Sequence, residues 1–222
     1  MRIEGKEVSL FPAEQPDAPL VVLNTYGGEG AAVLDAARKL TGAPFSLLSI
    51  SNLDWDADMS PWAIPPIAKG DTPCSGGADA YLETLTGRIL PSALGELPDK
   101  PLYLGLAGYS LAGLFAVYAM YRTDLFSRVA SASGSFWYPD FMDYVQKHEL
   151  TRKPESIYFS LGDKEAKTRN RILQPVEENT RSLERFYARQ GIQTVLEMNP
   201  GNHFQNGTER MAMGIAWMVD AP

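Results

Sequence analysis

The sequence predicts an α/β fold in which a mostly parallel, twisted sheet carries helices on both faces. Short apolar runs alternate along the chain with longer segments of helical character, which is the order expected of such a sheet. The 222 residues are 45% hydrophobic, which is enough for one domain with a substantial core. We therefore expect a single domain that spans residues 1–222.

Six apolar runs of strand length are predicted to form the parallel part of the sheet. They are Leu20–Asn24, Phe45–Ser51, Leu102–Ala107, Arg128–Ser133, Ser156–Leu161 and Thr194–Met198. An antiparallel strand is expected within residues 1–11.

Longer segments between these runs are predicted to be helices: Gly30–Leu40, Ala78–Leu94, Leu111–Tyr121, Pro175–Gln190 and Thr208–Val219. Residues 52–77 break the alternation, because they hold several prolines together with Trp55 and Trp62. We expect this segment to be an ordered loop that lines a binding site and forms only a minimal cap.

Composition and charge exclude several classes of function. The net charge of −7 argues against a nucleic-acid partner, which normally needs a clustered basic surface. The apolar stretches are shorter than the roughly 20 residues that cross a bilayer, so no membrane span is expected. The charged N-terminus does not resemble a secretion signal, and the lone Cys74 cannot form an internal disulfide. These features favour a cytoplasmic protein.

Ser110 stands between a predicted strand and a predicted helix, with no loop except its own turn. Such a sharp turn leaves room only for small residues beside the serine, and the residues at these positions are Gly108, Ala112 and Gly113. One interpretation is a helix cap, since a serine hydroxyl accepts hydrogen bonds from the amides of a first helical turn. The other interpretation is that Ser110 is a catalytic nucleophile, and the several small residues around it favour this interpretation.

A nucleophilic serine needs a base, and the chain contains two histidines, His148 and His203. His148 lies among charged residues at the end of an expected surface helix and is interpreted as a solvated side chain. His203 lies in the loop between the last strand and the last helix. Because parallel strands present their carboxyl ends at one edge, His203 is expected beside Ser110.

The base needs a carboxylate to orient it and to stabilise its charged form. The turn after Ser156–Leu161 offers two, Glu165 and Asp163. Glu165 is the first choice, because it follows the glycine that ends the strand by three residues, and Asp163 is the alternative. Either could instead be a loop charge or the cap of a helix. The order serine, acid, histidine agrees with this fold class.

A nucleophilic serine also needs backbone amides that stabilise the negatively charged oxygen of its tetrahedral intermediate. Leu111 should supply one amide, and the loop that contains Gly27 and Gly28 should supply the second. A phosphate site is the alternative for a glycine-rich turn after a strand. This turn, however, lacks the G-x-G-x-x-G spacing and an adjacent lysine.

From about residue 20 to residue 219 the chain resembles the α/β-hydrolase superfamily, in the putative-esterase branch that includes enterochelin esterases and esterase D. The resemblance is carried by Tyr26-Gly27-Gly28, Gly108-Tyr109-Ser110-Leu111-Ala112-Gly113, residues 131–137, Gly162-Asp163-Lys164-Glu165 and Gly201-Asn202-His203. It implies a three-layer fold and hydrolysis or acyl transfer through an acyl-serine, without naming the acyl group. The sequence departs from the common G-x-S-x-G elbow at Ala112.

We expect the substrate to be a small-molecule carboxylic ester, contacted by Tyr26, Tyr109, Trp62 and Trp137. Lys69, Arg169 and Arg171 could bind an anionic siderophore, which is a subordinate hypothesis. An acyltransferase on the same site and an inactive binding module remain alternatives. Two separated histidines and one cysteine do not supply the usual ligands of zinc, so neither a metal nor a cofactor is expected.

Overall fold

The computed structural model describes residues 1–221, whose main feature is an eight-stranded sheet with the order β1-β2-β4-β3-β7-β8-β9-β10. The six strands from β4 to β10 in this order are parallel to one another, whereas β2 is antiparallel to β4 and to β1. The strands are β1 (Arg2–Ile3), β2 (Lys6–Phe11), β3 (Leu20–Asn24), β4 (Ser46–Ser51), β7 (Leu104–Tyr109), β8 (Phe126–Ala132), β9 (Ser156–Gly162) and β10 (Gln193–Asn199). The predicted α/β class and parallel sheet are confirmed.

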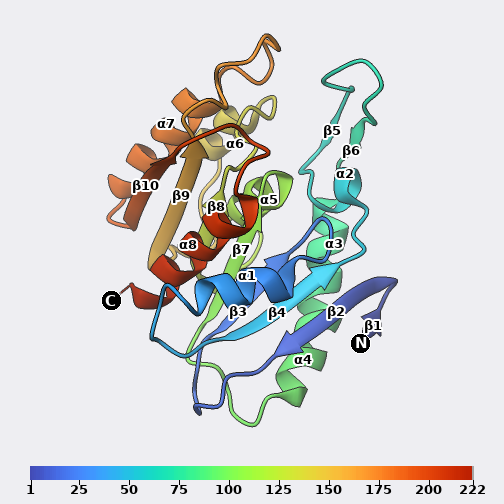
Figure 1. The fold of residues 1–222 in the computed structure, drawn as a ribbon. Coiled ribbons are helices and arrows are strands. Elements are labelled where there is room, and N and C mark those ends of the chain that lie inside the picture. Colours follow the sequence, from blue (N-terminus) through green and yellow to red (C-terminus); the bar gives the residue numbers. More distant parts are fainter. Residues whose placement is uncertain (222) are drawn as a thin grey trace.

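Helices cover both faces of this sheet (Figure 1). One face packs against α1 (Gly30–Ala37) and α8 (Gly207–Asp220), which lie in front of the sheet in Figure 1. The other face carries α3 (Ala78–Thr84), η1 (Leu85–Ile89), α4 (Leu90–Glu96), α5 (Leu111–Ala119), α6 (Phe141–Lys147) and α7 (Val176–Ala188). Every residue of α5 is buried, so this helix lies at the centre of the molecule.

Alternate residues of a strand point to opposite faces of the sheet, so the hydrophobic core consists of two clusters, one on each face. In β3, Leu20 and Val22 contact the cluster around α5, while Val21 and Leu23 contact the cluster around α1 and α8. All four side chains are buried. This strand therefore shows the continuous apolar run that a strand covered on both faces requires.

Residues 52–77 differ from the expected irregular loop. They contain a one-turn helix, α2 (Trp55–Asp58), and a small hairpin of β5 (Ala63–Ile64) and β6 (Cys74–Ser75). The Ser60 hydroxyl donates to the carbonyl of Asp56 and accepts from the amide of Gly76, so it ties the helix to the hairpin. Composition rich in proline concealed these pairings from the sequence pattern.

The predicted helix Ala78–Leu94 is present but is not uniform. A π-helical turn, η1, separates α3 from α4, and Pro91 follows it in the first turn of α4. Because proline has no amide hydrogen, a widened turn just before it spares a regular helical bond. The helix then ends at Glu96.

No helix of residues 1–221 is both long enough and apolar enough to cross a membrane.

Candidate active site

Ser110 lies at a strained turn between β7 and α5. Its backbone has φ 59° and ψ −124°, a conformation that residues other than glycine rarely adopt. A Cβ on Gly108 would lie 2.7 Å from the Cβ of Ala112, and a Cβ on Gly113 would lie 2.8 Å from Oγ of Ser131. The small residues at the elbow are therefore required by packing, and Ala112 fits in place of the usual glycine.

His203 reaches Ser110 from the loop between β10 and α8. Its Nε2 lies 2.9 Å from Oγ of Ser110. The hydroxyl of Tyr109 donates to the carbonyl of His203 at 2.8 Å and fixes the backbone beneath the imidazole. His148 lies elsewhere, as the cap of α6, with its ring stacked on Tyr144.

The carboxylate of Glu165 is buried, and both of its oxygens are bound. Oε2 lies 2.7 Å from Nδ1 of His203, while Oε1 accepts from the Gly162 amide at 2.7 Å and from the Ser133 hydroxyl at 2.8 Å. Burial raises the pKa of Glu165, but the hydrogen bond and charge of His203, together with the hydrogen bonds of the Gly162 amide and the Ser133 hydroxyl, hold the pKa below its usual value. The structure thus brings Ser110, His203 and Glu165 together in a chain of two hydrogen bonds.

Asp163, the alternative acid, does not contact the imidazole in this structure. Its Oδ1 accepts the amide of Gly201 at 2.8 Å, and its own amide donates to the carbonyl of Asn199. The side chain therefore fixes the turn that leads to His203. Its neighbour Glu165 reaches the ring because it lies at the end of the tight turn that starts at Gly162.

The residues expected to bind an oxyanion have different surroundings. Leu111 opens α5, where the first amides have no partner within the helix and can face a ligand. The Gly27 amide donates to the carboxylate of Glu29 at 2.8 Å, and the Tyr26 amide donates to the other oxygen at 3.3 Å. Gly28 has φ 81° and faces Ser51 rather than a cavity.

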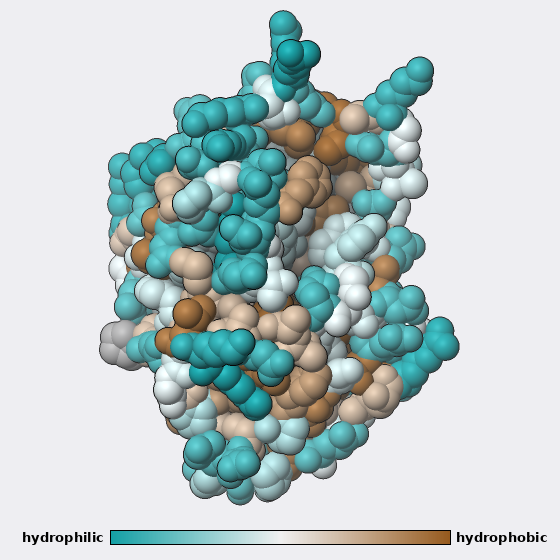
Figure 2. All heavy atoms as spheres, viewed as in Figure 1, coloured by the Kyte–Doolittle hydropathy of each residue, from teal (hydrophilic) through white to brown (hydrophobic). Residues whose placement is uncertain are grey.

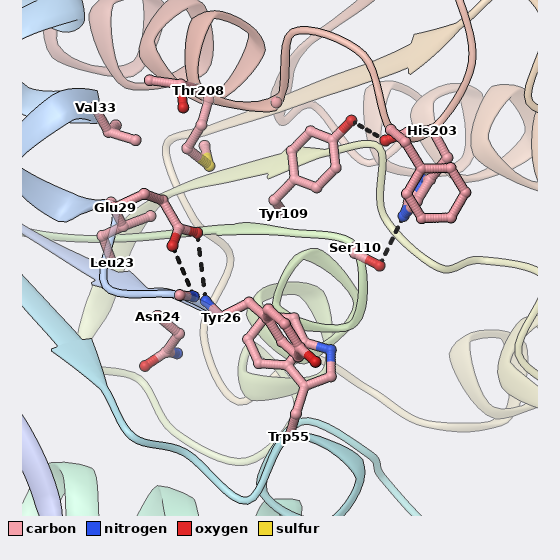
Figure 3. Close-up of a pocket in the computed structure, with 14 residues that line it drawn as sticks. Leu23, Asn24, Tyr26, Glu29, Val33, Trp55, Tyr109, Ser110, His203 and Thr208 are labelled. Atoms are coloured by element: carbon pink, nitrogen blue, oxygen red, sulfur yellow. Dashed lines mark hydrogen bonds between the residues drawn. The ribbon is translucent and has the colours of Figure 1, made fainter. Parts of the chain in front are cut away.

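Two cavities meet at Ser110 and His203. The first, of about 620 Å³, extends toward α1 and α8 and is lined by Asn24, Glu29, Tyr26 and Tyr109, among others. Figure 3 shows Ser110 and His203 at one end of it and Glu29 at the other. The second, of about 510 Å³, extends between residues 55–74 and residues 133–137. In Figure 2 the molecule is hollowed above the sheet, with apolar surface at the upper end of the hollow.

Three of the four aromatic residues expected to contact substrate line these cavities. Tyr26 and Tyr109 line the first cavity, and Trp137 lines the second. Trp62 lines neither of these cavities. Its ring packs against Tyr118, Tyr138 and Phe141, and its Nε1 donates to the carbonyl of Pro139.

Sequence reasoning missed several residues of this site. Phe204 lines both cavities and is 92% exposed, whereas Trp55, which also lines both, lies in the segment expected to border a binding site. Ser133 and the buried Arg210 contact Glu165. Residues 131–137 could have suggested Ser133, whereas nothing in the pattern around Arg210 distinguishes it from a surface position of a helix.

Within residues 1–221, no group of three or more His, Cys, Asp and Glu side chains is placed to hold a metal ion.

The fold and these side chains define a serine hydrolase of the α/β-hydrolase class. The model of the family described as "Putative esterase" matches residues 24–206, and the chain belongs to this family. It is accordingly a carboxylic ester hydrolase, as the strand-end glycine pair, the elbow and the histidine loop led us to expect.

The chain is also similar to other proteins in sequence and in structure. The uncharacterized protein YbbA of Bacillus subtilis is 21% identical over 169 residues, which cover 72% of this chain and 68% of that protein. The solved IroE-like serine hydrolase from Shewanella oneidensis is 17% identical with a TM-score of 0.77, over 95% of this chain and 74% of its own. The siderophore hydrolase EstA from Aspergillus nidulans is 16% identical with a TM-score of 0.70, over 96% of this chain and 94% of its own. At these identities, the two structures show a shared fold.

Proposed function

We propose that Ser110 is the nucleophile of a two-step ester hydrolysis in which His203 is the general base and Glu165 orients it. The observation that carries this proposal is the line of contacts from Oγ of Ser110 through the imidazole to Oε2 of Glu165, at 2.9 and 2.7 Å. A serine hydroxyl is a weak nucleophile until a base within hydrogen-bond reach takes its proton. Here the base is within reach, and its other nitrogen is bound.

In the first step, Oγ of Ser110 attacks the ester carbonyl carbon while Nε2 of His203 takes the hydroxyl proton. The ionised Glu165 stabilises the imidazolium that forms. The tetrahedral intermediate then collapses, the imidazolium gives its proton to the leaving alcohol oxygen, and an acyl-serine remains. In the second step, water loses a proton to His203 and attacks the acyl carbon, which releases the acid and restores Ser110.

The negative oxygen of the intermediate is placed against the Leu111 amide at the first turn of α5, whose dipole also favours negative charge. The second donor is assigned to the loop of Gly27 and Gly28. In this structure the Glu29 carboxylate accepts the Gly27 amide, so Glu29 must release it before an oxyanion can take its place. This competition between two anions for one amide is directly testable.

The two cavities suggest a substrate with two arms. Because they meet at Ser110, one arm of the ester would occupy each side of the scissile bond. Aromatic rings line both, including Tyr26 on one side and Trp137 on the other. We therefore infer a neutral ester with at least one apolar or aromatic arm.

A siderophore ester is the second candidate, and one feature of the surface favours it. Asn170 donates to the carbonyl of Ile67 at 2.9 Å, which joins two loops at the mouth of the second cavity. These loops carry exposed cations that could attract a strongly anionic substrate: Lys69, Lys164, Lys167, Arg169 and Arg171. The similarity to EstA, whose name describes a siderophore hydrolase, agrees with this candidate.

Pre-steady-state hydrolysis of a p-nitrophenyl ester tests the proposal. We expect a burst of p-nitrophenol that approaches one equivalent of enzyme when deacylation is slower than acylation, and no burst from Ser110→Ala or His203→Ala. An equal steady-state rate in Ser110→Ala would contradict the proposal. Absence of any turnover in folded wild-type protein would favour a binding module, and product carrying the acyl group on an added alcohol would identify an acyltransferase. A cytoplasmic location and the absence of a nucleic-acid partner stay predictions from composition.

A further inference from the structure

Arg210 is the largest fully buried side chain of the described residues, and it lies directly behind the proposed acid. It stands in the first turn of α8, and its side chain is 2% exposed. A buried guanidinium is costly unless its charge is paired and its donors are bound. The groups that pair it should therefore explain why it is there.

The guanidinium binds parts of the site that come from different strands. Nη1 lies 3.0 Å from Oε1 of Glu165 and 3.2 Å from both the Tyr109 and the Ser133 hydroxyl oxygens. Nη2 donates to the carbonyl of Pro200 at 3.0 Å. The end of β7 and the segments that follow β8, β9 and β10 thus meet at one side chain.

The two oxygens of Glu165 have different partners. Oε1 faces Arg210, Ser133 and the Gly162 amide, which leaves Oε2 for Nδ1 of His203 at 2.7 Å. A planar guanidinium restricts where a carboxylate oxygen can lie more closely than water could. Fixing Oε1 therefore fixes the direction in which Oε2 points.

Arg210 also fixes the histidine from the backbone side. Its Nη1 contacts the Tyr109 hydroxyl, which donates to the carbonyl of His203. Its Nη2 bond to Pro200 holds the start of the same loop. Acid and base are therefore both positioned by one residue that does not itself line either cavity.

We propose that Arg210 is a positioning residue, which sets the orientation of Glu165 toward His203 and balances its buried charge. The inference rests on the proposed function of Ser110, His203 and Glu165. Among residues 1–221, the groups bound to the carboxylate apart from Arg210 are the His203 imidazole, the Ser133 hydroxyl and the Gly162 amide, whereas Asp163 is bound to Gly201. Loss of the neighbouring positive charge should favour the imidazolium of His203. The imidazole would then stay protonated, and unable to act as a base, up to a higher pH.

Arg210→Met and Arg210→Lys test this role, and Arg128→Met is the matched control. Arg128 is also a buried arginine, 9% exposed, bound to Glu155 and to the carbonyls of Met218 and Ala221 at the opposite edge of the sheet. For a p-nitrophenyl ester, Arg210→Met should lower kcat by about 10²-fold with little change in KM. The acid limb of its kcat/KM profile should move to higher pH, and Arg210→Lys should move it less. Arg128→Met should lower thermal stability without moving that limb.

The double variant Arg210→Met/Glu165→Gln provides a readout that does not depend on the folding of Arg210→Met, because it removes both members of the buried ion pair. If Arg210 acts through Glu165, the double variant should have the kcat of Glu165→Gln alone. A further loss that multiplies the two single effects would overturn the inference, as would an unchanged kcat and pH profile in Arg210→Met. A Glu165→Gln variant with wild-type kcat would instead show that the proposed function itself fails.

Discussion

The carboxylate of Glu165 contacts Nδ1 of His203 at 2.7 Å, although the two residues are 38 positions apart in the sequence. Glu165 follows β9 and His203 follows β10, and these strands are parallel neighbours in register from Ser156 and Gln193 onward. Because the two strands end at the same edge of the sheet, residues that are far apart in the chain come into contact there. Both loops lie at the end of the sheet where Ser110 precedes α5.

Replacement of the two carboxylates should separate their roles. Glu165→Gln removes the charge that stabilises the imidazolium, so we expect kcat to fall by about 10²- to 10⁴-fold. Asp163→Asn keeps an oxygen for the Gly201 amide, so kcat should stay within about tenfold of wild type. Steady-state kinetics with an activated ester measures both, and the reverse ranking would exchange the two residues.

The lowered pKa of Glu165 predicts a dependence of stability on pH. Because its pKa in the folded protein lies below the ordinary value of 4.5, Glu165 stabilises the fold above about pH 4.5, and this contribution is lost as pH falls through the folded-state pKa. Glu165→Gln has no such group and should lose less stability over that acid range. Chemical denaturation at several pH values measures the two slopes; parallel curves for the two proteins would contradict the prediction.

Close packing at the elbow predicts that Gly108→Ala is destabilising. The added methyl group would meet Ala112 at 2.7 Å, and we expect a loss of about 1–3 kcal/mol in the free energy of unfolding. Gly95→Ala is the matched control, because Gly95 lies in α4 with open space around it and should gain about 0.5–1 kcal/mol. Denaturant titration of the two variants distinguishes them, and equal effects would show that the elbow tolerates a side chain at Gly108.

Competition for the Gly27 amide predicts that Glu29 weakens the binding of anionic transition-state analogues. Glu29→Gln replaces a carboxylate with a weaker, uncharged acceptor, so a boronic acid that forms an adduct with Ser110 should bind several-fold more tightly. Inhibition constants measure the change, with Asp35→Asn on the same helix as the control. Weaker binding in Glu29→Gln would indicate that the carboxylate serves only to shape its loop.

Replacement of Trp62, in residues 52–77, and of Trp137, which follows β8, should have different effects. Trp137→Ala opens the second cavity and should raise KM for esters with an aromatic arm, while thermal stability changes little. Trp62→Ala removes a ring packed among Tyr118, Tyr138 and Phe141 and should cost up to about 3 kcal/mol of stability with KM unchanged. Kinetics and thermal melts of both variants test the assignment, which a KM effect of Trp62→Ala would contradict.

Most of the sheet could be predicted from the sequence, because its central strands β3, β4, β7, β8 and β9 are mostly buried and rich in apolar residues. The first and last residues of the strands were harder to predict from the sequence. The strand expected at Leu102–Ala107 extends from Leu104 to Tyr109, since Leu102 is 75% exposed and the ladder with β8 continues to the elbow. The hairpin in residues 52–77 was missed because strands of two residues have no detectable period.

The site was predictable where a residue type is rare or a spacing is strict. With two histidines in the chain, His203 followed from topology, and Ser110 followed from its small neighbours. Arg210 and Glu29 could not be predicted, because a charged residue at or near the start of a helix is usually a solvated one. Only the contacts in the structure show that Arg210 is buried behind the acid and that Glu29 binds the amides of Tyr26 and Gly27.

The most direct measurement is labelling with a fluorophosphonate followed by peptide mass mapping. If the imidazole activates the elbow serine, wild-type protein should carry one phosphonyl group on Ser110, and His203→Ala should label at least about 10²-fold more slowly. A label on another residue, or an undiminished labelling rate in His203→Ala, would contradict the assignment of Ser110 and His203 as nucleophile and base.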